Sequence, residues 1–201
     1  MRQPVLAAAA ALLAVAAPLV PPGSCGDAAA LPGAARAEPV AQVDLERYAG
    51  RWYEIARYPN RFQAKCACCV SATYALREDG RMSVVNECRT RDGAAARAEG
   101  IARRAEASGP TSRLKVRFAP GFLSFLSAVW GDYWILDLPD DYSHALVGSP
   151  DHQYLWILAR EPSLPEDTYA RILAAAARQG FDPARLVRTP PQPVEAAAGP
   201  R

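Results

Sequence analysis

Cysteines are the residues best suited to chemistry in this 201-residue chain, and four of its five cysteines lie between residues 66 and 88. Cys66 and Cys69 have the C-x-x-C spacing of thiol redox pairs, but that chemistry needs a helix N-terminus to lower the thiol pKa, and here a strand is expected to follow. The chain has only two histidines, neither at ligand spacing from the cysteines, so we expect no metal site. The pattern therefore favours a disulfide.

The partner of Cys88 depends on the strand register around Asp79-Gly80, which is a tight hairpin signal. A two-residue turn places Cys88 opposite Ser71, one diagonal step from Cys69 on the same face, so the register favours a Cys69–Cys88 bond. A Cys66–Cys88 bond requires a bulge or a loose strand start, and it stays open. The other two cysteines of this group have no predicted partner.

The fifth cysteine, Cys25, follows an N-terminal segment typical of export. Arg2 precedes a short apolar run over residues 5–20, which indicates a secretory signal rather than a transmembrane span. Gly23-Ser24-Cys25 resembles a lipobox in which Cys25 is lipidated, whereas Ala35-Arg36-Ala37 fits ordinary release, and both sites stay open. An exported protein meets an oxidising environment, which favours the disulfide.

Other kinds of chemistry find little support. The chain shows no Ser-His-Asp order, no Gly-rich phosphate loop and no paired catalytic carboxylates, so we expect neither an enzyme nor a cofactor. It has 23 basic and 21 acidic residues, a net charge of +2, and no basic block, which argues against a nucleic-acid partner.

The elements that must position these residues are mostly short strands separated by turn signals about every ten residues. Sequential strands with short links form an up-and-down meander, and closure into an eight-stranded antiparallel β-barrel hides its edges. Such a barrel has room for side chains or one small ligand. The expected strands cover residues 51–58, 69–77, 81–89, 95–106, 112–118, 131–138, 143–149 and 153–160.

One long helix is predicted within residues 163–181, packed outside the all-β barrel. Pro165 lies in its first turn, Gly180 stands at the position after its end, and apolar residues recur at helical spacing. The apolar stripe consists of Tyr169, Ile172, Leu173 and Ala176. A helical turn capped by Asp44 precedes the first strand, and a short strand follows the long helix at residues 184–188.

Four segments result from this organisation. We expect a signal peptide over residues 1–24, or as far as residue 37 if the second cleavage site is used, then a Pro/Ala/Gly-rich tether over 25–42. The barrel domain covers 43–189, and a disordered tail covers 190–201.

Three motifs in this order make the chain resemble a lipocalin, within the branch of bacterial outer-membrane and apolipoprotein D-like members. They are Gly50-x-Trp52 at the first strand, Asp141-Tyr142 before the seventh and Arg160 at the end of the eighth, supported by "HALVGSP" and "YLWILAR". The resemblance covers roughly residues 43–187. It implies an antiparallel calyx open at one end, with an outer helix and a ninth strand, that binds small hydrophobic molecules. The bacterial branch is associated with fatty acids and lysophospholipids at the outer membrane. The disulfide that ties this strand to a C-terminal cysteine in animal relatives has no counterpart here.

Strand counting assigns the two ends of the barrel. If the first strand rises from Trp52, the eighth descends to Arg160, and the two meet at a closed floor as a cation–π plug. The loops 59–68, 90–94, 119–130 and 150–152 then surround the mouth. The third carries large apolar residues that cover the cavity as a lid, meet a membrane or a partner, or fold inward as core, and we favour a mouth that loads lipid. These residues are Phe122, Leu123, Phe125, Leu126, Val129 and Trp130.

Ligand-binding residues are expected on the calyx wall, where aromatic side chains offer large apolar contact area. Glu54 shares the parity of Trp52 and should point inward, where it either meets a ligand head group through water or pairs with an inward arginine. Parity shows which residues share a face but not which face is inside, so each candidate is also compatible with ordinary core packing. The wall candidates are Glu54, Tyr58, Tyr74, Phe118, Trp134, Leu136 and Trp156.

The function that these features predict is binding and carrying or storing fatty acids or lysophospholipids at the bacterial cell envelope, by a monomer or weak dimer. If Cys25 is lipidated, we expect an outer-membrane lipoprotein facing the periplasm, with the loop 119–130 as a further membrane contact; otherwise we expect a soluble periplasmic or secreted protein. The alternatives are a lipid-modifying enzyme of the lipocalin type and a structural envelope protein that docks a partner through its mouth loop.

Overall fold

The computed structural model describes residues 36–190 of the chain. The predicted signal peptide over residues 1–24, the lipidation site at Cys25 and the tail from residue 191 lie outside the described residues. Within residues 36–190, no helix has the length and apolar character needed to span a membrane.

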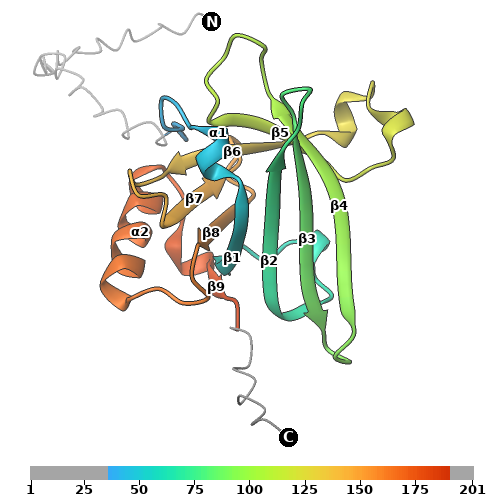
Figure 1. Ribbon diagram of the computed structural model, residues 1–201. Coiled ribbons are helices and arrows are strands. Elements are labelled where there is room, and N and C mark those ends of the chain that lie inside the picture. The colour runs from blue at the N-terminus through green and yellow to red at the C-terminus, as the bar shows by residue number, and fades with distance from the viewer. Residues whose placement is uncertain (1–35, 191–201) are drawn as a thin grey trace, which may run out of the picture. The chain divides into compact units, whose positions relative to one another are not determined.

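Nine strands form one antiparallel sheet that closes on itself (Figure 1). From β2 to β8 each strand pairs with the next along the chain, and β1 closes the ring by pairing with both β8 and β2. The predicted eight-stranded barrel is therefore confirmed, and the short β9 adds to the edge of β1. The strands are β1 (Gly50–Arg57), β2 (Cys66–Leu76), β3 (Met82–Thr90), β4 (Ala95–Arg104), β5 (Arg113–Arg117), β6 (Gly131–Asp137), β7 (His144–Gly148), β8 (Leu155–Ala159) and β9 (Val187–Arg188).

Two helices flank the barrel. The short α1 (Leu45–Tyr48) begins at Asp44, whose carboxylate accepts hydrogen bonds from the next free amides, as an N-cap should. The longer α2 (Glu166–Arg178) packs against the outside of the barrel beside β7 and β8 (Figure 1). Gly180 follows the C-cap residue Gln179, and its φ of +82° is the left-handed conformation expected at this position. The residues that it buries are Tyr169, Ile172, Ala175 and Ala176.

Side chains on the two faces of the barrel wall form two separate cores, because alternate residues of a strand point to opposite faces. The inner core fills the barrel around Trp52, and the outer core lies between the barrel and α2. Members of the inner core include Trp52, Ala72, Tyr74, Met82, Val84, Leu114, Tyr133, Ile135, Val147 and Leu158. Members of the outer core include Ile55, Ala56, Tyr58, Leu136, Leu146, Ile157, Tyr169, Ile172 and Phe181.

The hairpin between β2 and β3 differs from the predicted two-residue turn. The Arg77 amide donates to the Arg81 carbonyl, which leaves residues 78–80 in the turn, and Gly80 adopts a φ of +74°. Ser71 consequently pairs with Glu87 instead of Cys88. A shift of one residue moves Cys69 to the other face from Cys88, so the preferred Cys69–Cys88 bond was wrong.

The structure joins Cys66 to Cys88, with their Cα atoms 5.7 Å apart. The bulge that this alternative required is present, because the register of β2 against β3 shifts twice between Cys66 and Ser71. The other two cysteines, which had no predicted partner, are bonded to each other as neighbours, and Cys69 has a φ of +62°. All four cysteines between residues 66 and 88 are therefore disulfide-bonded.

The end of the predicted tether belongs to the folded domain. Ala37 is buried in the outer core, the Glu38 amide donates to the Gln179 side chain at 2.7 Å, and the Val40 amide donates to the Ile135 carbonyl at 2.9 Å. These bonds fix residues 37–40 against the barrel, so they do not act as a tether.

Candidate functional site

The closed end of the barrel is sealed by Trp52 and Arg160, as strand counting predicts. Trp52 is fully buried, and the Arg160 guanidinium lies 3.9 Å from its ring centre. The same guanidinium donates to the carbonyls of Arg47 and Arg51 at 2.7 and 3.0 Å. Gly50 allows this approach, since a Cβ there would stand 3.1 Å from the Arg160 side chain. Both residues contact the protein's own backbone and rings, which is the geometry of a structural plug.

Three tyrosine hydroxyls form a hydrogen-bonded row in the inner core. The Tyr133 hydroxyl lies 2.8 Å from that of Tyr48 and 2.9 Å from that of Tyr74. Burial raises the pKa of Tyr74 to about 12 and raises the pKa of Tyr48 and Tyr133 well above its ordinary value. The three phenols therefore stay neutral, so the row is polar but uncharged.

Glu54 is the buried carboxylate of the interior, and three donors reach it. The Arg57 guanidinium lies 2.6 Å from its Oε1, the Thr189 hydroxyl donates to the same oxygen, and the Gln63 amide donates to Oε2. These donors come from β1, the segment after β9 and the loop between β1 and β2. The inward arginine that the sequence did not identify is Arg57, three residues further along the same strand.

Trp156 joins this network from β8. Its indole Nε1 donates to the Gln63 amide oxygen at 2.9 Å, and its ring stacks on Tyr154 with 5.8 Å between ring centres. Trp156 is partly buried and packs against the inner core. Among the wall candidates, Trp156 and Glu54 are thus brought together through Gln63, whereas Tyr74 lies in the inner core beside Tyr133.

The inner face of β3 and β4 is accessible to solvent in part. Val84 belongs to the inner core, and its cross-strand partner is Gly100; further along the same face, Asn86 pairs with Ala98. Ala98 is nevertheless exposed, and Asn86 and Gly100 are half-buried. Solvent access to inward-facing residues is what a barrel with a ligand site at this wall requires.

Phe118 stands at the rim of this opening. It follows β5 with the parity of the inward-facing Leu114 and Val116, and its ring occupies the space where a side chain at Gly100 would be, 2.7 Å from an added Cβ. Phe118 is 43% exposed, so it borders the open end of the wall.

Tyr58, Trp134 and Leu136, however, do not line the interior. A register shift between Glu54 and Ala56 turns the end of β1 over, and Tyr58 packs on Phe181 with its hydroxyl donating to the Asp182 carbonyl at 2.8 Å. Trp134 and Leu136 share a face as parity predicts, but that face packs on the outer core. The inward residues of β6 are Tyr133 and Ile135.

The loop between β5 and β6 forms a projection that we call the finger, residues 118–130. It contains two short 3-10 helices, η2 (Gly121–Leu123) and η3 (Ser127–Val129). Phe122 and Phe125 are 75% and 78% exposed. The alternative in which these residues fold inward as core is therefore wrong for both phenylalanines.

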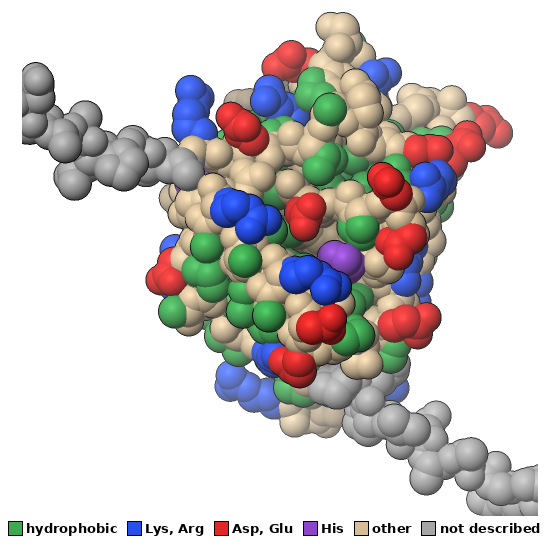
Figure 2. Space-filling view, turned by 90° about the vertical axis from the view of Figure 1, so that its left-hand side faces the viewer, with side chains coloured by type: hydrophobic (Ala, Val, Ile, Leu, Met, Phe, Trp, Pro, Cys, Tyr) green, Lys and Arg blue, Asp and Glu red, His purple; other side chains and the backbone are tan. Residues whose placement is uncertain are grey.

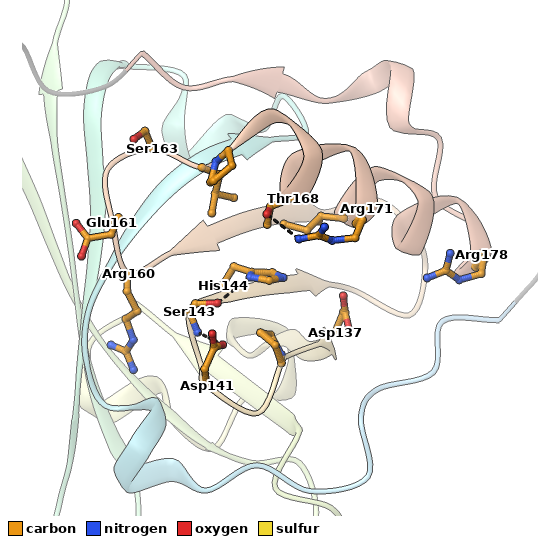
Figure 3. A pocket seen from close by; sticks show the side chains of 14 residues that line it. Asp137, Asp141, Ser143, His144, Arg160, Glu161, Ser163, Thr168, Arg171 and Arg178 are labelled. Atoms are coloured by element: carbon orange, nitrogen blue, oxygen red, sulfur yellow. Dashed lines mark hydrogen bonds between the residues drawn. The ribbon is translucent and has the colours of Figure 1, made fainter.

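Outside the barrel, an open groove of about 890 Å³ lies between α2 and the start of β7 (Figure 3). Its labelled side chains are mostly charged, with Arg171 on α2 facing His144 on β7. Acidic and basic side chains are interspersed over this whole face (Figure 2). A mixed-charge open groove does not suit an apolar ligand, which favours concave apolar sites. The barrel interior is the better candidate site.

Sequence reasoning missed several residues of the interior, above all Arg57, Gln63, Tyr48 and Tyr133. A one-residue change in the register of β1 places Arg57 in the interior. The loop between β1 and β2 folds over the mouth and places Gln63 there as well. No local sequence pattern marks either residue. The partner of Tyr74 could have been found, because Tyr133 alternates with the apolar Ile135 in one strand.

A family model described as "Lipocalin-like domain" matches residues 43–191 of the chain. The chain is 43% identical to "Temperature-induced lipocalin-1" of Arabidopsis thaliana over 154 residues, which cover 76% of this chain and 82% of that protein. It is 38% identical to "Outer membrane lipoprotein Blc" of Escherichia coli (strain K12) over 149 residues, covering 74% and 79%. It is 31% identical to "Apolipoprotein D" of Mus musculus over 153 residues, covering 73% and 76%.

Solved structures with the same fold include apocrustacyanin C1, with a TM-score of 0.60 and 19% identity over 75% of this chain and 81% of that chain. Insecticyanin from the tobacco hornworm Manduca sexta has a TM-score of 0.60 and 22% identity, covering 76% and 82%. At these identities the likeness supports the barrel fold alone.

Proposed function

The chain belongs to the lipocalin family, whose members bind small hydrophobic ligands, and from this premise we propose that it carries or stores fatty acids or lysophospholipids at the bacterial cell envelope. The observation that supports this proposal best is the solvent-accessible inner wall formed by Asn86, Ala98 and Gly100. Similarity to a protein named as an outer-membrane lipoprotein supports the cellular location and lipidation of Cys25.

The interior divides into parts that suit an amphiphile. The inner face of β3 and β4 offers apolar contact to an acyl chain, whose burial contributes about 25 cal/mol per Å². The half-buried Asn86 on the same face offers a neutral hydrogen-bonding group to a head group. Glu54 is already held by three donors of the protein itself, including the Arg57 guanidinium, which supports a structural ion pair and favours a carrier over an enzyme.

The finger is our proposed loading device. Large apolar side chains at 75% and 78% exposure are costly in water and favourable at a lipid surface. Phe118, at the root of the finger, also borders the calyx rim, so a lipid that meets the finger is close to the opening.

Native mass spectrometry of the protein purified from its own host tests the carrier function. We expect a co-purified fatty acid or lysophospholipid. Titration of delipidated protein with palmitic acid should then quench tryptophan fluorescence, chiefly through Trp156. Trp156→Phe should lose most of this quenching, whereas Trp134→Phe, on the outer face, should retain it.

An empty barrel from the host, combined with unquenched fluorescence on titration, would contradict the carrier function. That pair of results favours the structural alternative, in which the envelope protein docks a partner through the finger.

A further inference from the structure

Cations and indoles gather on the outer face of β4, β5 and β6, on the opposite side of the wall from the calyx. In β5, Arg113, Lys115 and Arg117 alternate with the inward-facing Leu114 and Val116. We call the resulting surface the arginine–tryptophan face. It consists of Arg103, Arg113, Lys115, Arg117, Trp130 and Trp134.

Contacts within this face stack arginines on tryptophans. The guanidinium carbons of Arg103 and Arg117 lie 4.4 and 5.2 Å from the ring centre of Trp130. The Arg113 guanidinium carbon lies 4.8 Å from the ring centre of Trp134, its cross-strand partner. Stacking holds the planar guanidinium groups in place and leaves their edges for hydrogen bonds.

Acidic partners are scarce on this face. Asp132 pairs with Lys115 at 2.8 Å, but within residues 36–190 none of Arg103, Arg113 and Arg117 forms an ion pair with a carboxylate. The face therefore carries three uncompensated positive charges, although the whole chain has a net charge of only +2.

Unpaired donors mark the same place. Across the described residues, four buried side-chain nitrogen or oxygen atoms have no hydrogen-bond partner, and three of them are the Nε atoms of Arg113 and Arg117 and the Nε1 atom of Trp134. Arg117 is only 6% exposed. A buried donor without an acceptor is costly, and all three groups are donors. These enclosed donors show that the face holds positive charge without an acceptor inside the protein. A phosphate group, with several anionic oxygens, matches the accessible guanidinium edges of the exposed Arg103 and the half-buried Arg113.

The finger identifies the source of the phosphate. Arg117 donates to the carbonyls of Ala119 and Pro120 at the root of the finger, and Trp130 ends it. If Phe122 and Phe125 enter the apolar layer of a leaflet, the arginines at the root come to the depth of the lipid phosphates. We propose that the arginine–tryptophan face binds the phosphate groups of an anionic phospholipid leaflet where the finger meets it. This inference rests on the proposed role of the finger as a membrane contact.

Vesicle flotation tests the proposal, with Cys25→Ser in the full chain so that no acyl anchor contributes. Vesicles of phosphatidylethanolamine with phosphatidylglycerol are compared with vesicles of phosphatidylcholine alone. The double variant Arg103→Gln/Arg113→Gln keeps the buried Arg117 and so preserves the fold. We expect it to bind the phosphatidylglycerol vesicles roughly 30-fold more weakly, about fivefold per arginine, with unchanged binding to phosphatidylcholine.

The matched control removes two exposed arginines from elsewhere, Arg36→Gln/Arg81→Gln, which lowers the net charge equally. If the control variant loses as much binding to the phosphatidylglycerol vesicles, net charge alone explains the effect and the proposal is overturned. Equal binding of the wild-type chain to both vesicle types would overturn it as well. Inorganic phosphate at matched ionic strength is the third arm. If it binds the wild-type chain and displaces it from vesicles more effectively than chloride, the face is a site for a free anion and the leaflet assignment is wrong.

Failure here is separable from failure of the proposed function. Phe122→Ser/Phe125→Ser should weaken binding to both vesicle types. If it weakens neither, the finger is not a membrane contact, whatever the arginine variants show.

Discussion

The two ends of this barrel are closed in different ways. At the floor, fully buried Trp52 lies under Arg160, which donates to two backbone carbonyls of the segment around α1. At the mouth, Glu54, Gln63 and Trp156 form a polar network with partners from separate segments, and the finger exposes its phenylalanines. From this contrast we predict that the floor contributes more to stability, whereas under the proposed function the mouth controls ligand entry.

The two inward tryptophans give the largest test of this contrast. Trp52→Ala removes a fully buried ring and should lower the free energy of unfolding by about 3–5 kcal/mol. Trp156→Ala, at a partly buried position, should cost less than half as much but weaken palmitic-acid binding. Urea denaturation and fluorescence titration measure the two effects. Equal stability losses would break the distinction between floor and mouth.

Alkaline pH should weaken the floor through the tyrosine row. The pKa of Tyr74 is about 12 in the folded state and 10 as its ordinary value, so its stabilising contribution is complete below pH 10 and is lost as the pH rises toward 12. The loss from Tyr74 alone is about 2–3 kcal/mol, because each pKa unit corresponds to about 1.4 kcal/mol. Melting temperatures measured from pH 8 to 12 should fall less steeply in Tyr74→Phe than in Tyr53→Phe, the control. Parallel profiles for the two variants would show that the row does not control alkaline stability.

Arg160→Ala tests the plug itself. Loss of the cation–π contact and of two hydrogen bonds to carbonyls should destabilise the protein by about 2 kcal/mol, with little change in ligand affinity. Arg178→Ala, an arginine at the edge of the outer groove, is the control. A large loss of affinity at an unchanged melting temperature would refute the structural assignment of Arg160.

Substitutions in the finger should have the smallest effect on stability and a clear effect on the rate of fatty-acid uptake. Replacing Phe122, Leu123, Phe125 and Leu126 with serine removes mostly exposed apolar surface, so the free energy of unfolding should change by less than about 0.5 kcal/mol. Fatty-acid uptake from vesicles should slow. Stopped-flow transfer rates equal to those of the wild type would reject the finger as a loading device.

Much of the fold could be predicted because its signals are local. Alternating strands, the Asp79-Gly80 turn and the capped helix each need only a few neighbouring residues to form, and they placed eight strands and α2 correctly. The floor was also predictable, since strand counting brings the start of the first strand to the end of the eighth. The register of β2 against β3 was not, because a turn of three residues instead of two moves every side chain to the other face.

The sequence by itself determined the barrel, its outer helix, the meeting of Trp52 with Arg160 and the apolar character of the finger. Only the tertiary structure decided which residues face the calyx. Trp134 and Leu136 look as suitable for a ligand wall as Tyr133 and Ile135, and α2 covers the first pair. The bulge after Glu54 turns Tyr58 outward and brings Arg57 in to the buried carboxylate. Side chains alternate with the same period on both faces of a strand, so the pattern does not show which face lines the interior. The elements that pack against the strand decide this.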